Sequence, residues 1–504
     1  MVCTRKKGSM AKKEKKIKGP EYIGFKEIFG ATALSTNNGL ANIFMSTMFM
    51  IFMTDYAGLG SWGAALATGL LLAARFIDAV DDPIQGAIMD GAKVTKHGKY
   101  KPFFMLSIIM TTVGTIALYC LPDGITKTPW LVAVWVIFFY FLYDIGMSFY
   151  NQNLLFRTMT SDPEQRSKLL IGPRLWVMVL GMFGSGLTAI AVTIQATTGS
   201  FKTAYMILAL ACMGISAAIS VVGWLMVKER HVVEQDEEEK IHFSDFVEVI
   251  KTNKAMLVCL AKDLFSGFIW TFLFAAPSYY VKYAYCLDPV TGVVDYAKLG
   301  TYSLIVSMMM LFPLIIGTVI ATPILKAYKG DFVKMQRLDY MVQGAAGLVM
   351  FVAQLLGLLQ RVPAIFFLCM FVMAMFIGVD FIPGSNIGME VMDYTVYKTG
   401  KDRSALTSAA SNFLMKAQSA LSSAVVGGLL MAIGYKVDSV TGDYIGEMSK
   451  MPTLLTGMII IIGLLPAVLA IISTLITFKY PIDQEERKKI QAYIAEHQSH
   501  KVEE

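Results

Sequence analysis

The chain has 504 residues, of which 55% are hydrophobic and 16% are charged, and its formal net charge is +6. Its mean hydropathy is +0.55. Soluble proteins carry about 25% charged residues, and a soluble fold could not bury this much apolar surface behind so few charges. The composition therefore excludes soluble domains, disordered chains, collagen and coiled coils, and it predicts an integral membrane protein.

Twelve mostly apolar segments follow one another along the chain, each long enough for a membrane helix of roughly 20 residues. They cover residues 27–53, 62–89, 103–121, 130–155, 169–194, 203–227, 255–281, 302–325, 338–360, 363–388, 404–434 and 452–478. We therefore predict an all-α integral membrane fold with twelve transmembrane helices.

A charged segment divides these helices into two equal sets. We predict a basic tail at 1–26, a six-helix bundle at 27–227, a charged linker at 228–245, a second six-helix bundle at 246–478 and a tail at 479–504. The segment could be an arbitrary loop. The equal numbers of helices on its two sides instead favour two bundles that meet around a central pathway.

Lysine and arginine are concentrated in the loops that lie on the same side as both tails. By the positive-inside rule, both termini are predicted to be cytoplasmic in a plasma-membrane protein. The basic tail at 1–26 is expected to contact anionic membrane lipid rather than nucleic acid. We expect the segment after Tyr480 to form a short solvated helix. The basic loop that follows Asp90 is expected to act as a gate latch, or else to be a plain positive-inside loop.

The second span contains four charged residues, although an ionisable side chain in lipid costs about 2.5–3.5 kcal/mol. On a helix, Arg75, Asp78 and Asp82 lie within about 60° of one another, whereas Asp81 points about 100° away from Asp82. Carboxylates this close repel unless a cation intervenes. We therefore expect Asp78 and Asp82 to bind Na⁺ or H⁺, with Arg75 and Asp81 as charge partners. The alternative is an Arg75–Asp78 ion pair, with Asp81 and Asp82 at a helix end.

Further charges are predicted in other spans: Asp144, Arg174, Lys262, Asp263, Asp380 and Lys416. Lys416 is the most informative, because it lies twelve residues after Ser404 in the eleventh span. A lysine at that depth needs a carboxylate or water, and the acidic face of the second span is its predicted partner. Lys262 and Asp263 are adjacent and do not face each other on an ideal helix. Snorkelling explains them as well as function does.

Other residue types argue against the competing classes. The six cysteines are scattered without a CxxC pair, and all five histidines lie outside the spans. We therefore expect no cofactor and no metal other than the coupling ion Na⁺. The rivals are an integral membrane enzyme and a channel. Against them, the sequence contains no HExxH motif, nucleophile elbow, P-loop or pore-loop repeat.

Several motifs occur in a characteristic order. They are MTDYAGL, AARFIDAVDDPIQGAIMD, KHGKYKPF, TSDPEQRSKLLIGPR, MDYTVYKTGKDRSA and FLMKAQSA. This series resembles the glycoside–pentoside–hexuronide:cation symporters, the family of the melibiose permease. The resemblance implies a major facilitator fold and cation-coupled sugar transport.

The resemblance also assigns roles to particular positions. Asp78 and Asp82 fall on the family's cation-binding aspartates, Lys416 on its functional eleventh-span lysine, and Arg174 on an arginine implicated in sugar binding. The family's two sugar-binding acids are not retained. The first-span acid is replaced in the region of Asn37 and Asn38, and the fourth-span aspartate corresponds to Phe149. The loss puts a melibiose-like galactoside in doubt and leaves a hexuronide, an organic anion or a lipid-like solute open.

We therefore predict an alternating-access symporter that couples Na⁺ or H⁺ to a sugar or glycoside and works as a monomer, and we expect no enzymatic activity. Amides and guanidinium groups can bind sugar hydroxyls, and an aromatic ring can face the apolar side of a sugar. The candidate solute-binding residues are Asn37, Asn38, Phe149, Tyr150, Asn151, Gln152, Asn153, Arg174 and Trp176. For the asparagines, hydrogen bonding between helices is an equally good interpretation.

Overall fold

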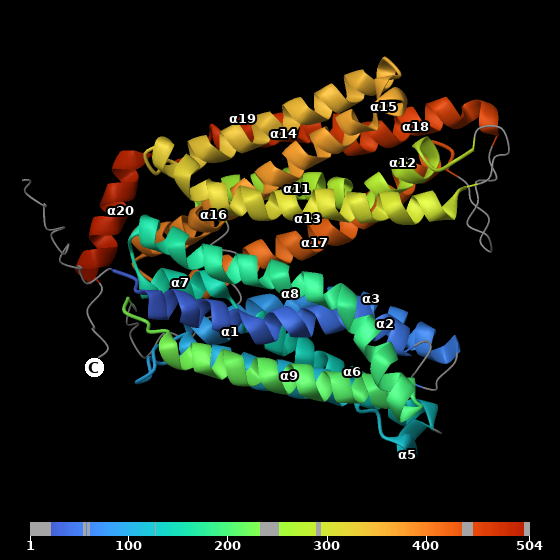
Figure 1. Ribbon diagram of the computed structural model, residues 1–504. Coiled ribbons are helices and arrows are strands. Elements are labelled where there is room, and N and C mark those ends of the chain that lie inside the picture. The colour runs from blue at the N-terminus through green and yellow to red at the C-terminus, as the bar shows by residue number, and fades with distance from the viewer. Residues whose placement is uncertain are drawn as a thin grey trace, which may run out of the picture.

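The computed structural model describes residues 22–53, 57, 61–126, 128–231, 251, 253–288, 294–435 and 447–497. Within these ranges the chain is almost entirely helical (Figure 1). Most of the predicted basic tail and linker, at 1–21 and 232–250, lies outside the described residues.

The first half of the chain forms one bundle. Its elements are α1 Phe25–Ile43, η1 Phe44–Met48, α2 Phe49–Ile51, α3 Ser61–Asp90, α4 Lys101–Tyr119, α5 Asp123–Thr126, α6 Pro129–Ser148, α7 Gln152–Met159, α8 Pro163–Thr198 and α9 Phe201–Met226. Helix α1 packs against α8 and α9, and α4 packs against α6 and α9.

The second half forms the other bundle. Its elements are α11 Lys254–Ala275, α12 Pro277–Ala284, α13 Tyr296–Ala327, α14 Phe332–Leu355, α15 Leu358–Arg361, α16 Pro363–Thr399, α17 Ser404–Ala432, η3 Met448–Lys450, α18 Met451–Ile459, η4 Ile460–Leu464, α19 Leu465–Thr477 and α20 Gln484–His497. Helix α16 packs against α13 and α14, and α19 packs against α11 and α14.

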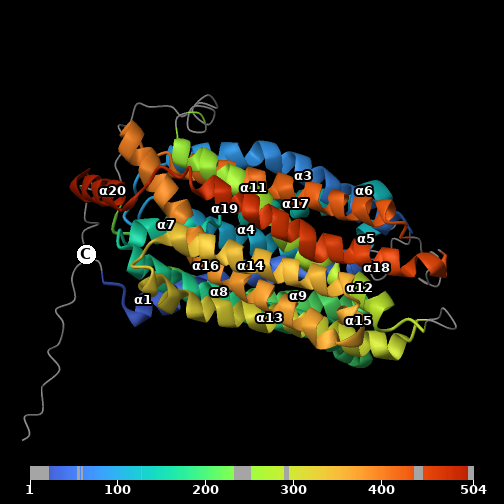
Figure 2. The ribbon, with the colours of Figure 1, turned by 90° about the horizontal axis from the view of Figure 1, so that it is seen from above.

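The two bundles lie side by side with their long helices roughly parallel (Figures 1 and 2). Their main contact joins α3 to α17, and α8 also contacts α13 and α16. The fold prediction, an all-α membrane protein with two six-helix bundles, is therefore confirmed.

The helices differ in how apolar they are. Within the described residues, eight helical segments are long and apolar enough to cross a membrane by length and composition. Four other long helices, α1, α3, α8 and α17, fall outside that set. These four carry most of the predicted site residues. A helix that lines a polar cavity needs less apolar surface than one surrounded by lipid.

Three predictions about individual elements were wrong. The fourth span is not continuous, because α6 ends at Ser148 and α7 begins at Gln152. The tenth span continues to Thr399 as α16, well beyond the predicted end at 388. The C-terminal helix α20 is docked rather than solvated: its Ile490 and Ile494 are buried.

Glycines allow the closest helix contact of the second bundle. A Cβ atom on Gly317 of α13 would lie 1.8 Å from the carbonyl oxygen of Met375 on α16. A Cβ on Gly378 of α16 would lie 2.2 Å from the carbonyl oxygen of Leu314 on α13. Small residues let helix backbones approach closely inside a membrane, where packing drives association. These two glycines therefore set the distance between α13 and α16.

We expect Gly317→Ala to destabilise the protein by at least about 1–3 kcal/mol, since the added methyl group forces two backbones apart. Thermal unfolding in detergent micelles measures this change. Gly300→Ala is the matched control on α13, because a Cβ there meets nothing within 4 Å. It should be neutral or stabilising by about 0.5–1 kcal/mol. Equal effects of the two substitutions would contradict the close contact.

Candidate functional site

The break between α6 and α7 shapes the centre of the molecule. The backbone of Asn151 is extended, and its side-chain oxygen accepts a hydrogen bond from the backbone N–H of Leu154 at 3.4 Å. Asn151 therefore caps α7, as asparagine commonly does at a helix start. The Asn151 side-chain amide also donates to the hydroxyl of Ser408 on α17. The broken helix thus presents polar residues to the second bundle.

A first cavity of about 260 Å³ lies at this break. It is lined by Tyr150, Asn151, Gln152, Asn153, Leu170, Arg174, Phe381, Ile382, Ser385, Ser408 and Asn412. Both bundles contribute to this wall, and most of the lining side chains are polar. Five of the predicted solute-binding residues, Tyr150 to Asn153 and Arg174, are therefore brought together.

Arg174 joins this cavity to a second one of about 350 Å³. Its guanidinium carbon lies 4.1 Å from the ring centre of Phe381, in a cation–π contact between α8 and α16. Both residues line both cavities. The remaining polar and aromatic lining of the second cavity includes Asp263, Ser266, Trp270, Tyr340, Gln343, Asp380 and Gln418. Together the two cavities offer hydroxyls, amides, carboxylates, a guanidinium and aromatic rings to one small polar solute.

An ion pair crosses the bundles beside the first cavity. Lys416 Nζ on α17 lies 3.0 and 3.1 Å from the two carboxylate oxygens of Asp82 on α3. Asp82 is buried, and the Lys416 side chain is 29% exposed. The helices can meet here because Gly86 has no side chain; a Cβ there would lie 3.0 Å from the Ala405 carbonyl oxygen. The predicted pairing of Lys416 with the acidic face of the second span is confirmed.

A small gap of about 10 Å³ adjoins Asp82 and is lined also by Gln85, Asn151 and Asn412. This volume is close to that needed by one water molecule. Asn151 and Asn412 also line the first cavity, so they separate it from Asp82 by a single layer of side chains. Carboxylate and amide oxygens suit a hard cation. Among the described residues, no cluster of three or more histidine, cysteine or acidic side chains is present.

Other residues of the predicted acidic face are only partly described. The Asp81 carboxylate accepts a hydrogen bond of 2.6 Å from the Gln85 amide. The backbones of Arg75 and Asp78 lie in α3, but their side chains are outside the described part of the chain. The roles of Asp78 in the cation site and of Arg75 as its charge partner stay predictions.

Four candidate solute-binding residues do not line the two cavities. The Asn37 amide donates to Thr111 and accepts from Thr112 and Ser216, so it joins α1 to α4 and α9. Asn38 is buried against Ser107 of α4. Their placement corrects the solute-binding assignment in favour of hydrogen bonding between helices.

The two aromatic candidates are likewise used in packing. The Trp176 indole donates to the hydroxyl of Thr36 on α1 at 2.9 Å. Phe149 is buried against Phe103, with ring centres 5.5 Å apart. Neither residue lines the two cavities.

For the charges of the seventh span, the sequence left snorkelling and function open, and the structure disfavours snorkelling. Lys262 does not snorkel: it is buried, and its Nζ lies 2.5 Å from Asp263. Adjacent residues can pair in this way because the flexible lysine stem bends back. The sequence interpretation did not single out Asp339, because this residue falls at the very start of the span predicted to begin at 338. In the structure α14 begins at Phe332, so Asp339 lies well inside the helix. Glutamines three residues before it and four after it, at helical spacing, were the available signal.

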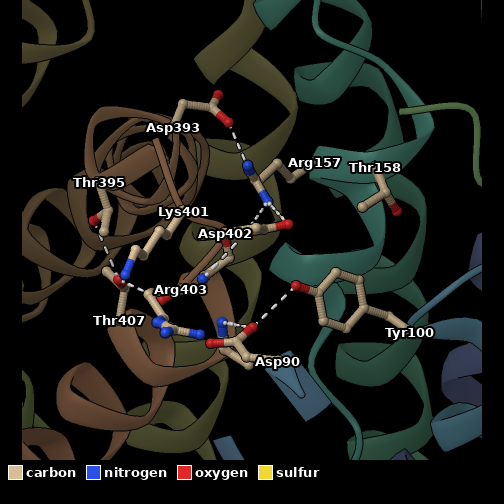
Figure 3. Close-up of polar contacts among 12 residues, drawn as sticks. Asp90, Tyr100, Arg157, Thr158, Asp393, Thr395, Lys401, Asp402, Arg403 and Thr407 are labelled. Carbon is tan, nitrogen blue, oxygen red and sulfur yellow. Dashed lines mark hydrogen bonds and ion pairs between the residues drawn. The ribbon is translucent and has the colours of Figure 1, made fainter. Parts of the chain in front are cut away.

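A second set of ion pairs joins the bundles (Figure 3). It lies toward the end of the molecule where α16 contacts α20 (Figure 1). We call it the closing network; its charged members are Asp90, Arg157, Arg166, Asp393 and Asp402. Arg157 contacts Asp393 at 2.6 Å and Asp402 at 3.2 Å, and Arg166 contacts Asp393 at 2.8 Å. All five are buried.

Asp90 completes the closing network at the end of α3. Its carboxylate accepts hydrogen bonds of 2.9 Å from the backbone N–H groups of Ala405 and Leu406. These groups open α17, where the helix dipole favours a negative charge. The Tyr100 hydroxyl donates to the same carboxylate at 3.1 Å. Asp90 therefore forms a direct contact between the two bundles. This contact supports the interpretation of the adjoining loop as a latch.

The sequence interpretation missed most of this network. It counted Arg157 and Arg166 as ordinary basic loop residues, because both fall between predicted spans. Asp393 and Asp402 were treated as part of a loop, although Asp393 lies within α16. The available signal for three of these residues was their occurrence inside two motifs, Arg166 in TSDPEQR and both Asp393 and Asp402 in MDYTVYKTGKDRSA.

Comparison with known proteins gives a consistent family match. Residues 29–484 match the family described as MFS/sugar transport protein. The uncharacterized symporter YjmB of Bacillus subtilis (strain 168) is 24% identical over 87% of this chain and 88% of its own length. The Escherichia coli (strain K12) protein YagG, provisionally named a glycoside/cation symporter, is 23% identical over 79% of this chain and 81% of its own length.

Solved structures share the fold. The chain is similar to FucP, described as a major facilitator superfamily transporter in the outward conformation, with a TM-score of 0.60 and 13% identity. That match covers 92% of this chain and 100% of FucP. A bacterial homologue of the iron transporter ferroportin gives a TM-score of 0.59 at 11% identity, over 91% of this chain and 99% of the homologue.

We expect Arg157→Gln to lower the free energy of unfolding by roughly 3–5 kcal/mol, because two buried carboxylates lose their shared cation. Thermal unfolding of the purified protein checks this change. Lys168→Gln is the control, since its 3.5 Å pair with Glu164 is exposed, and it should cost less than about 1 kcal/mol. A small effect of Arg157→Gln would show that the closing network does not hold the bundles together.

Proposed function

The chain belongs to the MFS/sugar transport protein family, and from this premise we propose that it is a cation-coupled symporter of a sugar or glycoside. It is a multi-pass membrane protein of a transporter family. The observation that carries the proposal is the Lys416–Asp82 pair, which bridges the bundles beside a cavity built by both. The symporter names of its relatives support the same activity.

The coupling step follows from competition for Asp82. Without a bound cation, Lys416 neutralises Asp82 and holds α17 against α3. When Na⁺ or H⁺ occupies Asp82, that attraction weakens, and Lys416 becomes free to turn toward the cavity. Asp78 lies one helical turn before Asp82 and would supply the second carboxylate. Because each ligand then stabilises the same arrangement, cation and solute raise each other's affinity.

The solute class follows from the lining of the two cavities. Amides at Asn151, Gln152 and Asn153 suit hydroxyl groups, and Trp270 can face the apolar side of a sugar ring. The two sugar-binding acids that the family carries in its first and fourth spans are not retained in this chain. Asp263 and Asp380 of the second bundle would supply carboxylates to the solute in their place. Arg174 points into the same space and favours a hexuronide or another anionic solute as the second candidate.

Transport requires the closing network to open. The network seals the α20 end, which we assign to the cytoplasm of the plasma membrane with both termini inside. Alternating access then rocks one bundle against the other around the central cavity. Because each bundle supplies part of one cavity within a single chain, a monomer is sufficient. No catalytic role is assigned to any residue.

A ligand screen identifies the solute. Thermal unfolding of the purified chain would be followed with a panel of sugars, glycosides and hexuronides, with and without Na⁺. A solute that binds the native state raises the unfolding temperature. A coupled cation should increase that shift, whereas a panel without any shift would reject the sugar assignment.

We expect Asp82→Asn to abolish uphill uptake of that solute into proteoliposomes driven by a Na⁺ or pH gradient. Downhill exchange should persist, because the amide cannot carry the coupling charge but leaves the cavity intact. Asp123→Asn, at an exposed pair with Lys202, is the control and should transport normally. Gradient-driven accumulation by Asp82→Asn would reject the coupling role.

We expect Arg174→Ala to weaken solute binding roughly 10- to 100-fold, the worth of one charge-assisted hydrogen bond. Isothermal titration with the identified solute measures this loss. Arg361→Ala, on the exposed end of α15, provides the comparison and should leave affinity unchanged. Unaltered affinity of Arg174→Ala would place the solute elsewhere.

A further inference from the structure

The second bundle contains a buried acidic group that the coupling mechanism does not use. Asp339 of α14 has a solvent exposure of 0%. Asp380 of α16 and the adjacent Lys262 and Asp263 of α11 are close enough to interact with it or with one another electrostatically. These four residues belong to three different helices of one bundle and lie apart from Asp82.

Charge within this group is unbalanced. The single lysine is already paired, because Lys262 Nζ lies 2.5 Å from Asp263. Asp380 accepts a hydrogen bond of 2.7 Å from the neutral amide of Gln336. Asp339 accepts one of 2.8 Å from the neutral amide of Gln343. One lysine of the second bundle therefore faces three carboxyl groups. Arg174 of the first bundle lines the second cavity with Asp263 and Asp380, and its guanidinium stacks on Phe381.

No further counter-charge is available to Asp339 among the described residues. Its Oδ1 atom has no hydrogen-bond partner there. The ionisable groups that interact with it are Asp380 from α16 and Lys262 from α11. Of the other elements packed against α14, the segments α18, η4 and α19 contain no ionisable residue. The cations of α13 and α15, which also contact α14, are exposed: Lys298, Lys326 and Arg361. An ionised carboxylate at such a position is strongly disfavoured relative to its neutral form.

A short path leads from Asp339 to the second cavity. Gln343, which donates to Asp339 Oδ2, lines that cavity together with Asp380, Asp263 and Tyr340. Asp339 thus lies one side chain behind the cavity wall. Asp380, which interacts electrostatically with Asp339, is part of that wall.

We propose that Asp339 is a proton-binding site of the second bundle, separate from Asp82 and Lys416, that exchanges its proton with the cavity through Asp380. Loss of this proton places a negative charge behind the wall. That charge competes with Asp263 for Lys262, so the cavity carboxylate of Asp263 becomes available to solute. The site therefore links protonation to the charge of the second cavity.

The test uses infrared spectroscopy of the full chain reconstituted in lipid and needs no transported solute. A protonated carboxyl gives a carbonyl stretch well separated from that of a carboxylate. We expect this band in the wild type and its loss in Asp339→Asn, which keeps size and amide-compatible hydrogen bonding. Asp331→Asn at the start of α14, where Asp331 pairs with Lys334, is the matched control and should retain the band, as should Asp82→Asn.

Two further variants test the assignment without removing the carboxyl group. Gln343→Leu should move the band to higher frequency, because the carbonyl loses its hydrogen-bond donor. Asp380→Asn should slow the shift of the band after transfer to D₂O. Persistence of the full band in Asp339→Asn, or no response to Gln343→Leu, would overturn the proton site. An unchanged exchange rate in Asp380→Asn would overturn the route. Retention of the band in Asp82→Asn keeps this outcome independent of the coupling proposal.

Discussion

The structure depends on the cost of placing ionised side chains where water is scarce. Such a charge is tolerated when a counter-charge or several hydrogen bonds reach it, and the partner must usually come from another helix. Here Lys416 on α17 reaches Asp82 on α3, and Arg157 on α7 reaches Asp393 on α16. Both pairs cross between the bundles. These ion pairs are polar contacts between the bundles, and apolar residues of both bundles, such as Phe156 of α7 and Ile382 of α16, share one buried cluster.

This arrangement suits a protein that must hold two states. The stability of an interface made only of apolar surface would change little when a small ion binds. An ion pair responds directly, because a cation at one carboxylate alters the attraction that joins two helices. The polar helices α8 and α17 line the first cavity at the break around Asn151, and α3 contributes Asp82 beside it. The Asn37 hydrogen bonds hold α1 against α4 and α9 within the first bundle.

Some site residues could be recognised from the sequence because they violate a simple rule. Lys416 and Asp82 are charges in otherwise apolar segments, so each predicted a partner, and they are indeed paired. Arg157 and Asp393 violate no such rule, since a charge between two spans looks like any loop residue. Asn37 and Asn153 are both polar residues of the first bundle, yet one joins helices and the other lines the cavity. Residue type alone cannot distinguish these two uses.

Hydropathy along the chain was sufficient to determine the twelve-helix membrane fold, its division into halves and the helices that hold buried charge. Those properties depend on the local preference of each segment for lipid or water. Only the tertiary structure decided which charges pair, which asparagines face the cavity and where α6 gives way to α7. These features depend on how helices rotate and cross, because a rotation of half a turn exchanges cavity and interface. The group around Asp339 shows the same limit: its spacing was visible in the sequence, but its isolation from counter-charge is a property of three packed helices.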